Sequence, residues 1–320
     1  MVIAGPLFKL SARPGQGHRL DNGLEHGEAA LPVIFTHPDL PDDFVKIGDV
    51  RADTPAGAIP SIVRPYEAGR ALYFPQLKFD IDHDFWADLA TEGCPKLKKL
   101  PSSPDRDDPA KDPVLDRRLV DAGLPKTLER RLRREIARFY KSALPVYEAL
   151  FAGYRFTRRQ VVWRLNTVRN ENLHVDTYAA PYRDHFARLF INLDNQPRIW
   201  MTSWSLDELY ARFGGEIDPQ VLATASANDL HTAVSRAAFG GRSTIWWDRQ
   251  PRHVAYFDPG DVWAVDSRQL SHQIFYGRRA VSIDFFVDPA SMAKPKRQYL
   301  TLAERFRKRA QAAQMAQAAE

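Results

Sequence analysis

The feature that most constrains the fold is a series of short apolar runs, each bounded by turn residues, between about residue 155 and residue 288. Two of these runs flank the turn Pro259-Gly260-Asp261, and another follows Gly277, as the turn preferences of Pro and Gly predict. Short runs in which polar and apolar residues alternate are typical of half-buried β-strands. This part of the chain is therefore predicted to be mainly β.

Two histidines and one aspartate within these strands have a spacing that suits a metal ion. His174 and Asp176 are two residues apart, so in an extended strand both side chains leave the same face. His272 lies in another alternating run, Ser271-His272-Gln273-Ile274. Two imidazoles and one carboxylate form the facial triad of non-haem Fe(II) oxygenases, which leaves coordination positions open. We therefore predict that His174, Asp176 and His272 are the metal ligands and the catalytic residues.

The opposing interpretation is that these histidines are structural. A single histidine in an apolar strand is more often a buried, hydrogen-bonded residue than a ligand. The order of His174, Asp176, the Pro-Gly-Asp turn and His272 favours the metal site, because context is what supports a motif. The other histidines have no comparable spacing. His185 and His253 are the nearest alternatives and are interpreted as surface or hydrogen-bonded residues.

An arginine follows the last predicted ligand. Arg279 shares a strand face with Val281, Ile283 and Phe285, so its guanidinium is expected to point inward and to need an anionic partner. The distal carboxylate of 2-oxoglutarate would supply one through a bidentate contact. A register shift of one residue would select Arg278 in its place, so both stay candidates for cofactor binding.

Another strand, residues 187–193, follows the His-x-Asp pair and carries Arg188, Phe190 and Asn192 on one face. Alternation does not say which face of a strand is buried. Arg188 and Asn192 are therefore equally consistent with a pocket and with a solvent-exposed face. Both are retained as cofactor-binding candidates.

The remainder of the chain divides into three parts. Residues 1–125 are rich in Pro, Gly and Asp and predict an irregular N-terminal extension with short strands such as residues 71–74, packing on the core. Residues 126–290 are expected to hold an amphipathic helix at 127–150 and the catalytic core. A helical insertion is expected at 205–240. Its first helix starts at the capping-box pattern Ser205-x-x-Glu208, and its second helix covers 219–239. Residues 291–320 are a basic tail, interpreted as a solvated terminal helix.

Composition limits the class of protein. At 320 residues and 44% hydrophobic residues the chain can bury a sizeable core. It has neither an apolar stretch of membrane-spanning length nor a signal-peptide core, and the single Cys94 excludes an internal disulfide and a cysteine cluster. We therefore expect a cytoplasmic protein. The net charge of +5 and pI near 9.2 favour anionic partners. The arginines on the 127–150 helix are interrupted by Glu129 and Glu135, which favours a solvated face over a nucleic-acid surface.

The ordered motifs resemble those of the Fe(II)/2-oxoglutarate dioxygenases, in which His-x-Asp is followed by a distal His and then an Arg. The resemblance implies a double-stranded β-helix (jelly-roll, cupin-like) core with flanking helices. It also implies Fe(II), 2-oxoglutarate and O₂ as requirements, with ascorbate as an accessory for sustained activity. Asp176 occupies the carboxylate position that halogenating members of the superfamily lack, which favours hydroxylation.

Within that superfamily, several segments look like the bacterial Kdo hydroxylases, which hydroxylate 3-deoxy-D-manno-oct-2-ulosonic acid of the lipopolysaccharide inner core. The similar segments are 71–77, 144–147, 169–176, 188–194 and 197–200, and the likeness extends over residues 70–290. The resemblance implies a Kdo-type sugar acid, small or lipid-linked, as substrate. After Asp176 this chain reads Thr177-Tyr178-Ala179-Ala180-Pro181 and departs from the family pattern, so the reaction carries over more directly than the sugar.

An anionic substrate needs cations near the metal, and Arg169 and Arg164 are candidates, with Tyr178 beside the ligands as a further contact. For Arg164 a structural role at a strand edge is the competing interpretation. The basic tail suggests peripheral contact with the inner membrane. Two other functions stay open: the same chemistry on a free amino acid or another small polar metabolite, and a non-catalytic β-helix binding protein. Oligomeric state is not predicted.

Overall fold

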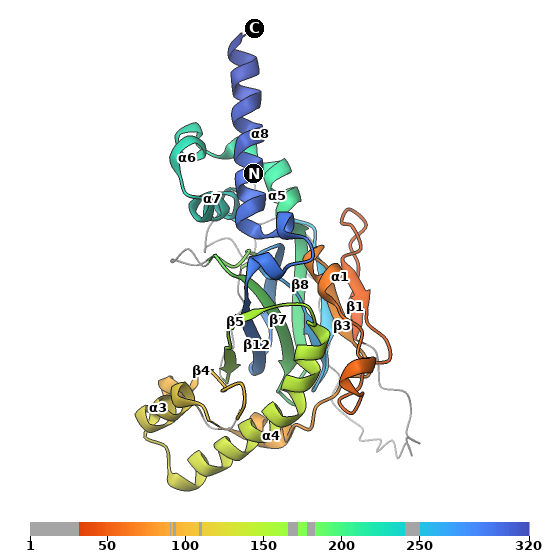
Figure 1. Cartoon of the computed structure of the whole chain (residues 1–320), viewed down its shortest axis with the longest axis vertical. Helices are drawn as coiled ribbons and strands as arrows, with labels where there is room; N and C mark the ends of the chain where they lie inside the picture. The colour runs from red at the N-terminus through yellow and green to blue at the C-terminus, as the bar shows by residue number, and fades with distance from the viewer. Residues whose placement is uncertain are drawn as a thin grey trace, which may run out of the picture. The chain divides into compact units, whose positions relative to one another are not determined.

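Two β-sheets form the centre of the protein (Figure 1). The computed structural model describes residues 32–89, 91, 94–108, 111–165, 172–177, 183–240 and 250–319, all within one compact unit. The four-stranded sheet has the order β1 (Val33–Phe35), β9 (His253–Phe257), β8 (Arg198–Ser205) and β11 (Leu270–Tyr276). The eight-stranded sheet has the order β2 (Phe44–Lys46), β3 (Ala71–Phe74), β10 (Val262–Ala264), β7 (His185–Asn192), β12 (Ala280–Val287), β6 (Val161–Arg164) and β4 (Lys99–Ser102), with β5 (Phe156–Arg158) also paired to β12.

From β7 onward the chain crosses repeatedly between the two sheets. β7, β10 and β12 belong to the large sheet, β8, β9 and β11 belong to the small one, and neighbours within each group pair antiparallel. This winding is a double-stranded β-helix, so the predicted jelly-roll core is confirmed. The predicted strand at 71–74 is also present, as β3.

Alternation along β12 separates two environments. Val281, Ile283 and Phe285 are buried in the largest apolar core, on the side of the eight-stranded sheet that the helices cover. Ser282 pairs in register with Phe190, which packs among residues of both sheets, so this second face looks into the jelly roll. Ser282 and Asp284 therefore introduce polar groups into the space between the sheets.

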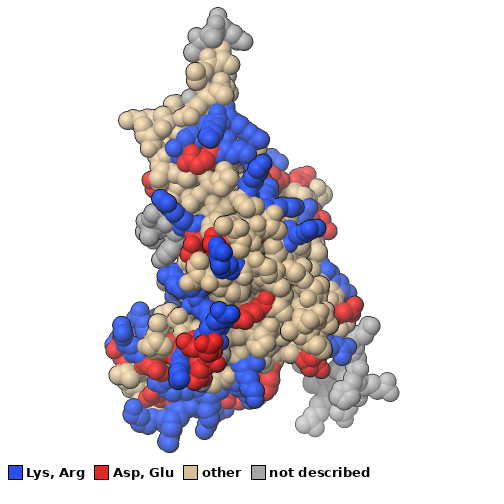
Figure 2. All heavy atoms as spheres, viewed as in Figure 1, with Lys and Arg blue, Asp and Glu red and all other residues tan. Residues whose placement is uncertain are grey.

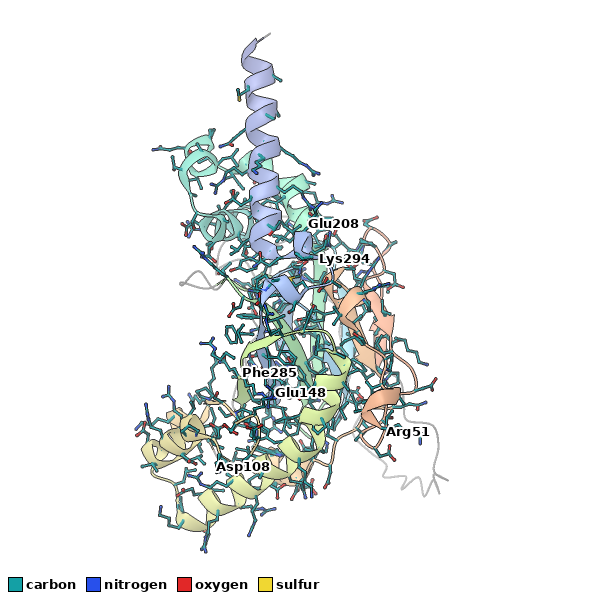
Figure 3. All side chains as sticks on the ribbon, viewed as in Figure 1. Arg51, Asp108, Glu148, Glu208, Phe285 and Lys294 are labelled. Atoms are coloured by element: carbon teal, nitrogen blue, oxygen red, sulfur yellow. The ribbon has the colours of Figure 1, made fainter. Side chains whose placement is uncertain are left out.

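The predicted amphipathic helix is present as α4 (Lys126–Leu150) and contains Pro145. It covers the outer face of the eight-stranded sheet. The Tyr147 hydroxyl donates to the Ala187 carbonyl at 2.9 Å, and the Tyr147 and Phe285 rings lie 4.7 Å apart. Figure 3 shows Phe285 beside the C-terminal half of this helix. α4 thereby fixes the large sheet from behind.

The exposed face of α4 carries charges of both signs. Arg131 pairs with Asp82, and Arg133 pairs with both Asp116 and Glu129. Figure 2 shows Lys and Arg interleaved with Asp and Glu over the end of the protein where α3 (Pro113–Ala122) and α4 lie. These ion pairs agree with the interpretation of the arginines as a solvated face.

The helical insertion between β8 and β9 folds as α5 (Leu206–Phe213), the 3₁₀ turn η3 (Gly214–Glu216), α6 (Pro219–Thr224) and α7 (Ala227–Phe239). The predicted capping box is present: Ser205 accepts from the Glu208 backbone, and Glu208, labelled in Figure 3, accepts from the Ser205 N–H at 2.8 Å. The single helix predicted at 219–239 is wrong, because Ser226 caps a separate α7 by accepting from the Asp229 N–H.

Two other expectations change. The N-terminal part supplies β1 to β4 to the sheets and is more regular than predicted. The tail forms α8 (Tyr299–Ala319), whose Tyr299, Leu302 and Ala303 are buried against α5 and α7, so its first turns are docked and not solvated.

The remaining short elements are η1 (Ala56–Ala58), α1 (Val63–Glu67), α2 (His83–Asp88), η2 (Pro95–Leu97), η4 (Pro289–Ser291) and η5 (Pro295–Arg297). Among the described residues, no helix combines the length and apolarity required to cross a bilayer.

Phe139 tests how much stability the contact between α4 and the sheet contributes. Its ring is buried and lies 5.1 Å from the Trp163 ring of β6. Phe139→Ala is expected to lower the free energy of unfolding by about 3–5 kcal/mol, because it leaves a cavity in the core. Arg134→Ala, on the exposed face of the same helix, is the matched control and is expected to change it by less than about 0.5 kcal/mol. Denaturant unfolding measures both, and equal effects would contradict this packing.

Candidate metal centre

Backbone pairing brings the three predicted ligands together. His174 forms an isolated antiparallel bridge with His272 of β11, with N–H to carbonyl distances of 3.0 and 2.8 Å. The two imidazole rings lie 4.5 Å apart, and the His174 Nε2 atom is 3.5 Å from Asp176 Oδ1. One ligand atom from each of the three residues lies within 4.8 Å of the others. The spacing read from the sequence therefore corresponds to a cluster in space.

Hydrogen bonds to the backbone orient both imidazoles. His174 Nδ1 lies 2.7 Å from the Asn172 carbonyl oxygen, and His272 Nδ1 lies 3.2 Å from the Leu270 carbonyl oxygen. A carbonyl accepts only from a protonated nitrogen, so in each ring Nδ1 carries the hydrogen and Nε2 keeps its lone pair. Burial and the neighbouring His174 lower the pKa of His272 to about 3. His272 is thus a neutral imidazole near pH 7, which is the form that binds metals.

Asp176 is held by contacts to its other carboxylate oxygen. Its Oδ2 accepts from the Ser267 hydroxyl at 2.7 Å and from the Arg188 guanidinium, while its backbone N–H donates to the Ser267 carbonyl at 2.8 Å. Burial by itself would raise the pKa of Asp176, but Arg188 and the two histidines outweigh it and hold that pKa well below its usual range. Oδ1 is left directed toward the His174 imidazole, on a carboxylate that stays ionised.

Behind the triad lies a buried polar layer. His231 of α7 lies 3.1 Å from the Asp176 carbonyl oxygen, and its ring packs 5.2 Å from the Tyr299 ring of α8. The fully buried Arg268 guanidinium lies 4.2 Å from the same Tyr299 ring and 3.5 Å from Asp266. The helical insertion and the C-terminal helix therefore contact the segment that carries the predicted ligands.

A cavity of about 220 Å³ opens beside Asp176, on the face of the large sheet that looks into the jelly roll. Four of its lining side chains are cationic and two are carboxylates, an excess of two positive charges. The cavity is lined by Lys99, Arg158, Gln160, Val162, Arg164, Asp176, Phe186, Arg188, Asp284 and Phe286. Within it, Arg188 Nε lies 3.2 Å from Asp284 Oδ1, and the Arg158 guanidinium stacks 3.5 Å from the Phe286 ring centroid. The interior next to the triad is thus suited to anions.

The other predicted site residues have three different outcomes. Arg188 and Arg164 line this cavity. Asn192 does not: its amide donates to the carbonyls of Gln196 and Phe257 and so supports the turn after β7. Arg169 and Tyr178 lie outside the described residues.

The two arginines after His272 are not brought to the triad. Arg279 has the predicted neighbours Val281 and Ile283, but that face packs under the helices, where its guanidinium donates to the Leu89 carbonyl at 2.8 Å. Arg278 is bound in a bidentate contact by Asp194, at 3.0 and 2.7 Å. The physical reason is that strand alternation groups residues by face without saying which face the helices cover.

Several residues of the site were not found from the sequence. Ser267 and Asp284 both contact the charges around Asp176, and Ser282 links Asp284 to Arg164. One signal was available: Asp284 is the only charged residue of the mainly apolar β12, and a buried carboxylate requires a cation. Ser267, in a loop far along the chain, gave no comparable signal.

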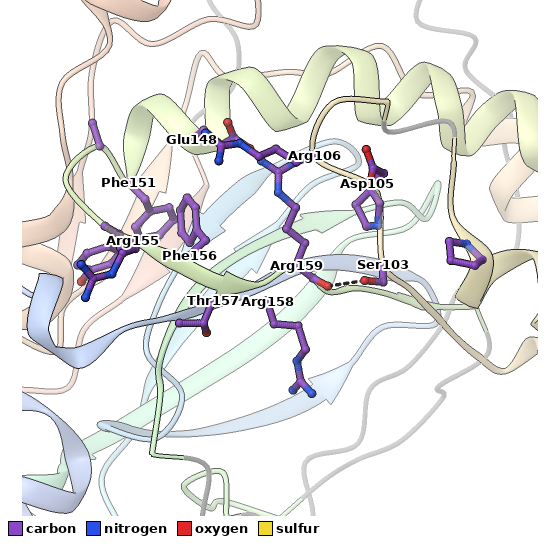
Figure 4. A pocket seen from close by; sticks show the side chains of 14 residues that line it. Ser103, Asp105, Arg106, Glu148, Phe151, Arg155, Phe156, Thr157, Arg158 and Arg159 are labelled. Atoms are coloured by element: carbon purple, nitrogen blue, oxygen red, sulfur yellow. Dashed lines mark hydrogen bonds and ion pairs between the residues drawn. The ribbon is translucent and has the colours of Figure 1, made fainter.

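A larger cavity, of about 820 Å³, lies away from the triad between α4, β5 and residues 103–106 (Figure 4). Two of its arginines are engaged: Arg159 pairs with Glu148, and Arg155 pairs with Asp288. Figure 4 shows the Arg158 side chain leaving β5 on the opposite side from that of Arg159. No predicted ligand lines this cavity.

Fold and site together define a jelly-roll protein with a two-histidine, one-carboxylate cluster at the mouth of a cationic interior. Solved structures of the Kdo hydroxylase KdoO, a non-heme Fe(II) alphaketoglutarate dependent dioxygenase, have the same fold. The apo form and the complex with alphaketoglutarate and Fe(III) each match with a TM-score of 0.61, and the cobalt(II) complex matches with 0.58. Identity is 15%, over 82% of this chain and 94–95% of those chains. The predicted resemblance is confirmed at the level of the fold. No family model and no curated protein matches the sequence.

Replacing Arg188 tests whether it holds the predicted ligand Asp176. Arg188→Met is expected to weaken divalent metal binding about 10–100-fold, because Asp176 loses the cation that orients it and keeps it ionised. Anaerobic calorimetric titration with Fe(II) or Co(II) at pH 7 measures the change. Arg155→Met, at an exposed ion pair, is the control. Unchanged metal affinity in Arg188→Met would show that the contact is incidental.

His185 gives the polar layer a measurable pH dependence. Burial and then the nearby Arg268 lower the pKa of His185 to about 4, against about 6.5 in an unfolded chain. Between these values the unfolded state binds a proton that the folded state does not, so stability is lost as pH falls from about 6.5 toward 4, by about 1.4 kcal/mol per pH unit. His185→Gln is therefore expected to lose less stability between pH 6 and 5 than wild type does, by about that amount. Denaturant unfolding measures the free energy of unfolding of both proteins at each pH. If the two free energies fall in parallel between pH 6 and 5, the prediction is ruled out.

Proposed function

We propose that this protein is an Fe(II)- and 2-oxoglutarate-dependent hydroxylase that acts on a Kdo-type sugar acid. The observation that carries the proposal is the convergence of His174, Asp176 and His272 within 4.8 Å, with both Nδ1 atoms already engaged by carbonyls. Three donor atoms from two separate segments that lie this close together can hold a metal ion.

The donor set fits non-haem iron better than a structural zinc ion. Structural zinc sites use four protein ligands, commonly cysteines. Here three N and O donors come together, and no fourth His, Cys, Asp or Glu joins the group among the described residues. Two imidazoles with one carboxylate leave positions open for a co-substrate and O₂. With Fe(II) bound, the site would supply O₂ activation, in which one oxygen atom enters a substrate C–H bond as a hydroxyl and the other enters succinate formed with CO₂ from 2-oxoglutarate.

This chain's own residues would prepare the site for that chemistry. Arg188 and Ser267 fix the Asp176 carboxylate, so that Oδ1 is the oxygen presented to the metal. The jelly roll buries His272, which keeps its imidazole neutral and limits access of water. The positive excess of the adjoining cavity attracts the dianionic co-substrate. A KdoO structure in complex with alphaketoglutarate and Fe(III), on the same fold, supports this co-substrate.

The substrate is proposed from charge and from the structural likeness together. The cavity rim carries Lys99 and Arg158, which suit a carboxylate-bearing sugar. The KdoO structures supply the sugar class. A lipid-linked form and peripheral contact with an anionic membrane belong to the same proposal, although Arg297 and Arg305 of the basic tail both pair with Asp207 and so have partners within the protein.

Coupled turnover of 2-oxoglutarate tests this function directly. Anaerobically purified protein is given Fe(II), 2-oxoglutarate and ascorbate, then O₂, and succinate is measured without substrate and with free Kdo, Kdo-containing lipid or a panel of free amino acids. We expect succinate to rise with a Kdo compound, with oxygen incorporated into that compound. His174→Ala should lower the rate by more than about 100-fold, because even residues behind metal ligands cost about 10–100-fold.

The control variant is His37→Gln, whose ring lies outside the metal centre and contacts its own loop. Succinate that depends on His174 but responds only to amino acids would retain the reaction and reject the sugar. Succinate formation that is equal in wild type and His174→Ala, or the absence of Fe(II) binding, would reject the enzyme itself.

A further inference from the structure

The proposed co-substrate needs a cation for its distal carboxylate, and the arginines after His272 do not offer one. Arg279 lies on the helix-covered face, and Arg278 is held by Asp194. Arg188 faces the interior but is committed to Asp176, Ser267 and Asp284. The distal carboxylate must therefore meet another strand of the jelly roll.

Arg164 of β6 occupies the required place. It pairs in register with Ala280 of β12, and its Nη1 donates to the Ser282 hydroxyl at 2.5 Å. Ser282 in turn donates to Asp284 Oδ2 at 2.9 Å, and Asp284 contacts Arg188 beside the triad. The Arg164 guanidinium is thus one alternate strand position beyond the charge cluster that holds Asp176.

The spacing agrees with the length of the co-substrate. Alternate residues on a strand lie roughly 6.6 Å apart, so Ser282 is about that far along β12 from Asp284. The terminal carbons of a five-carbon dicarboxylate are about 5 Å apart when its bonds of ~1.5 Å are extended. Asp176 and Arg164 line the same cavity, so a 2-oxo acid held at the triad through one end would extend its other carboxylate along this cavity toward Arg164.

The walls of the interior favour this direction over others. On the β7 side of β12, Phe190 stacks on Trp263 of β10 at 5.5 Å, and the Trp200 ring of the small sheet packs 5.2 Å from the His272 ring. These aromatic rings fill the space there and offer an anion no charge. On the opposite side lie Arg164 and its register partner Lys99, whose pKa is lowered by burial and by Arg164.

We propose that Arg164, positioned by the Ser282 hydroxyl, binds the distal carboxylate of 2-oxoglutarate. This assignment rests on the proposed function. It places recognition of the distal carboxylate on β6, whereas the sequence predicted an arginine at the start of β12. The guanidinium offers a two-pronged contact to the carboxylate, and Ser282 fixes the guanidinium before binding.

The test compares two keto acids that differ only at the distal end. Under anaerobic conditions, Fe(II)-loaded protein is titrated with 2-oxoglutarate and with 2-oxovalerate, which ends in a methyl group, by calorimetry and by the visible charge-transfer band of the chelate. Wild type is expected to prefer 2-oxoglutarate. Arg164→Met should lose about 10–100-fold in affinity for 2-oxoglutarate only, with Fe(II) and 2-oxovalerate binding unchanged. The affinity of Arg164→Lys for 2-oxoglutarate should lie between those of wild type and Arg164→Met.

Arg279→Met is the rival variant, and Arg155→Met is the neutral control. Loss of the preference in Arg279→Met, or its retention in Arg164→Met, would overturn the assignment. Equal loss of both keto acids in Arg164→Met would also overturn it, because that pattern describes a role in folding or in metal binding. Wild type that binds Fe(II) but neither keto acid would instead reject the proposed function.

Discussion

The guanidinium of Arg188 pairs with two carboxylates in the interior that would otherwise repel each other. Asp284 faces it from β12 and Asp176 faces it from the segment that carries His174, and a buried carboxylate without a cation is strongly destabilising. With Arg188 present, Asp176 stays ionised and Asp284 can accept from Ser282. One buried cation therefore sets the orientation of a predicted ligand and the polarity of the cavity beside it.

The location of that cation follows from strand alternation. β7 places Ala187 and Leu189 against α4 and turns Arg188 toward the other sheet. The helices contribute at a second level: α7 reaches the Asp176 backbone through His231, and α8 covers Arg268 with Tyr299. His174 and Asp176 thus lie on a short segment fixed from three directions, by β11, by the loop holding Ser267 and by the helical insertion.

Local patterns in the sequence were sufficient to predict the fold class and the three side chains that cluster in space. The i, i+2 spacing of His174 and Asp176 and the alternation around His272 each depend on a single strand, as does the capping box at Ser205. What the sequence could not supply were pairings between distant strands. Arg164 reaches Ser282 because β6 pairs with β12, and Arg279 lies on the helix-covered face, where it donates to the Leu89 carbonyl at the end of α2. The docking of α8 is likewise a tertiary contact, which a solvated-tail interpretation based on charge could not anticipate.

A crystal grown or soaked anaerobically with Mn(II) and 2-oxoglutarate would test the central claim most directly, through the anomalous signal of the metal. The account predicts one peak within coordination distance of His174 Nε2, His272 Nε2 and Asp176 Oδ1, with the keto acid on the metal and its far carboxylate at Arg164. A map without metal at this position, while His174, Asp176 and His272 are well ordered, would contradict the account.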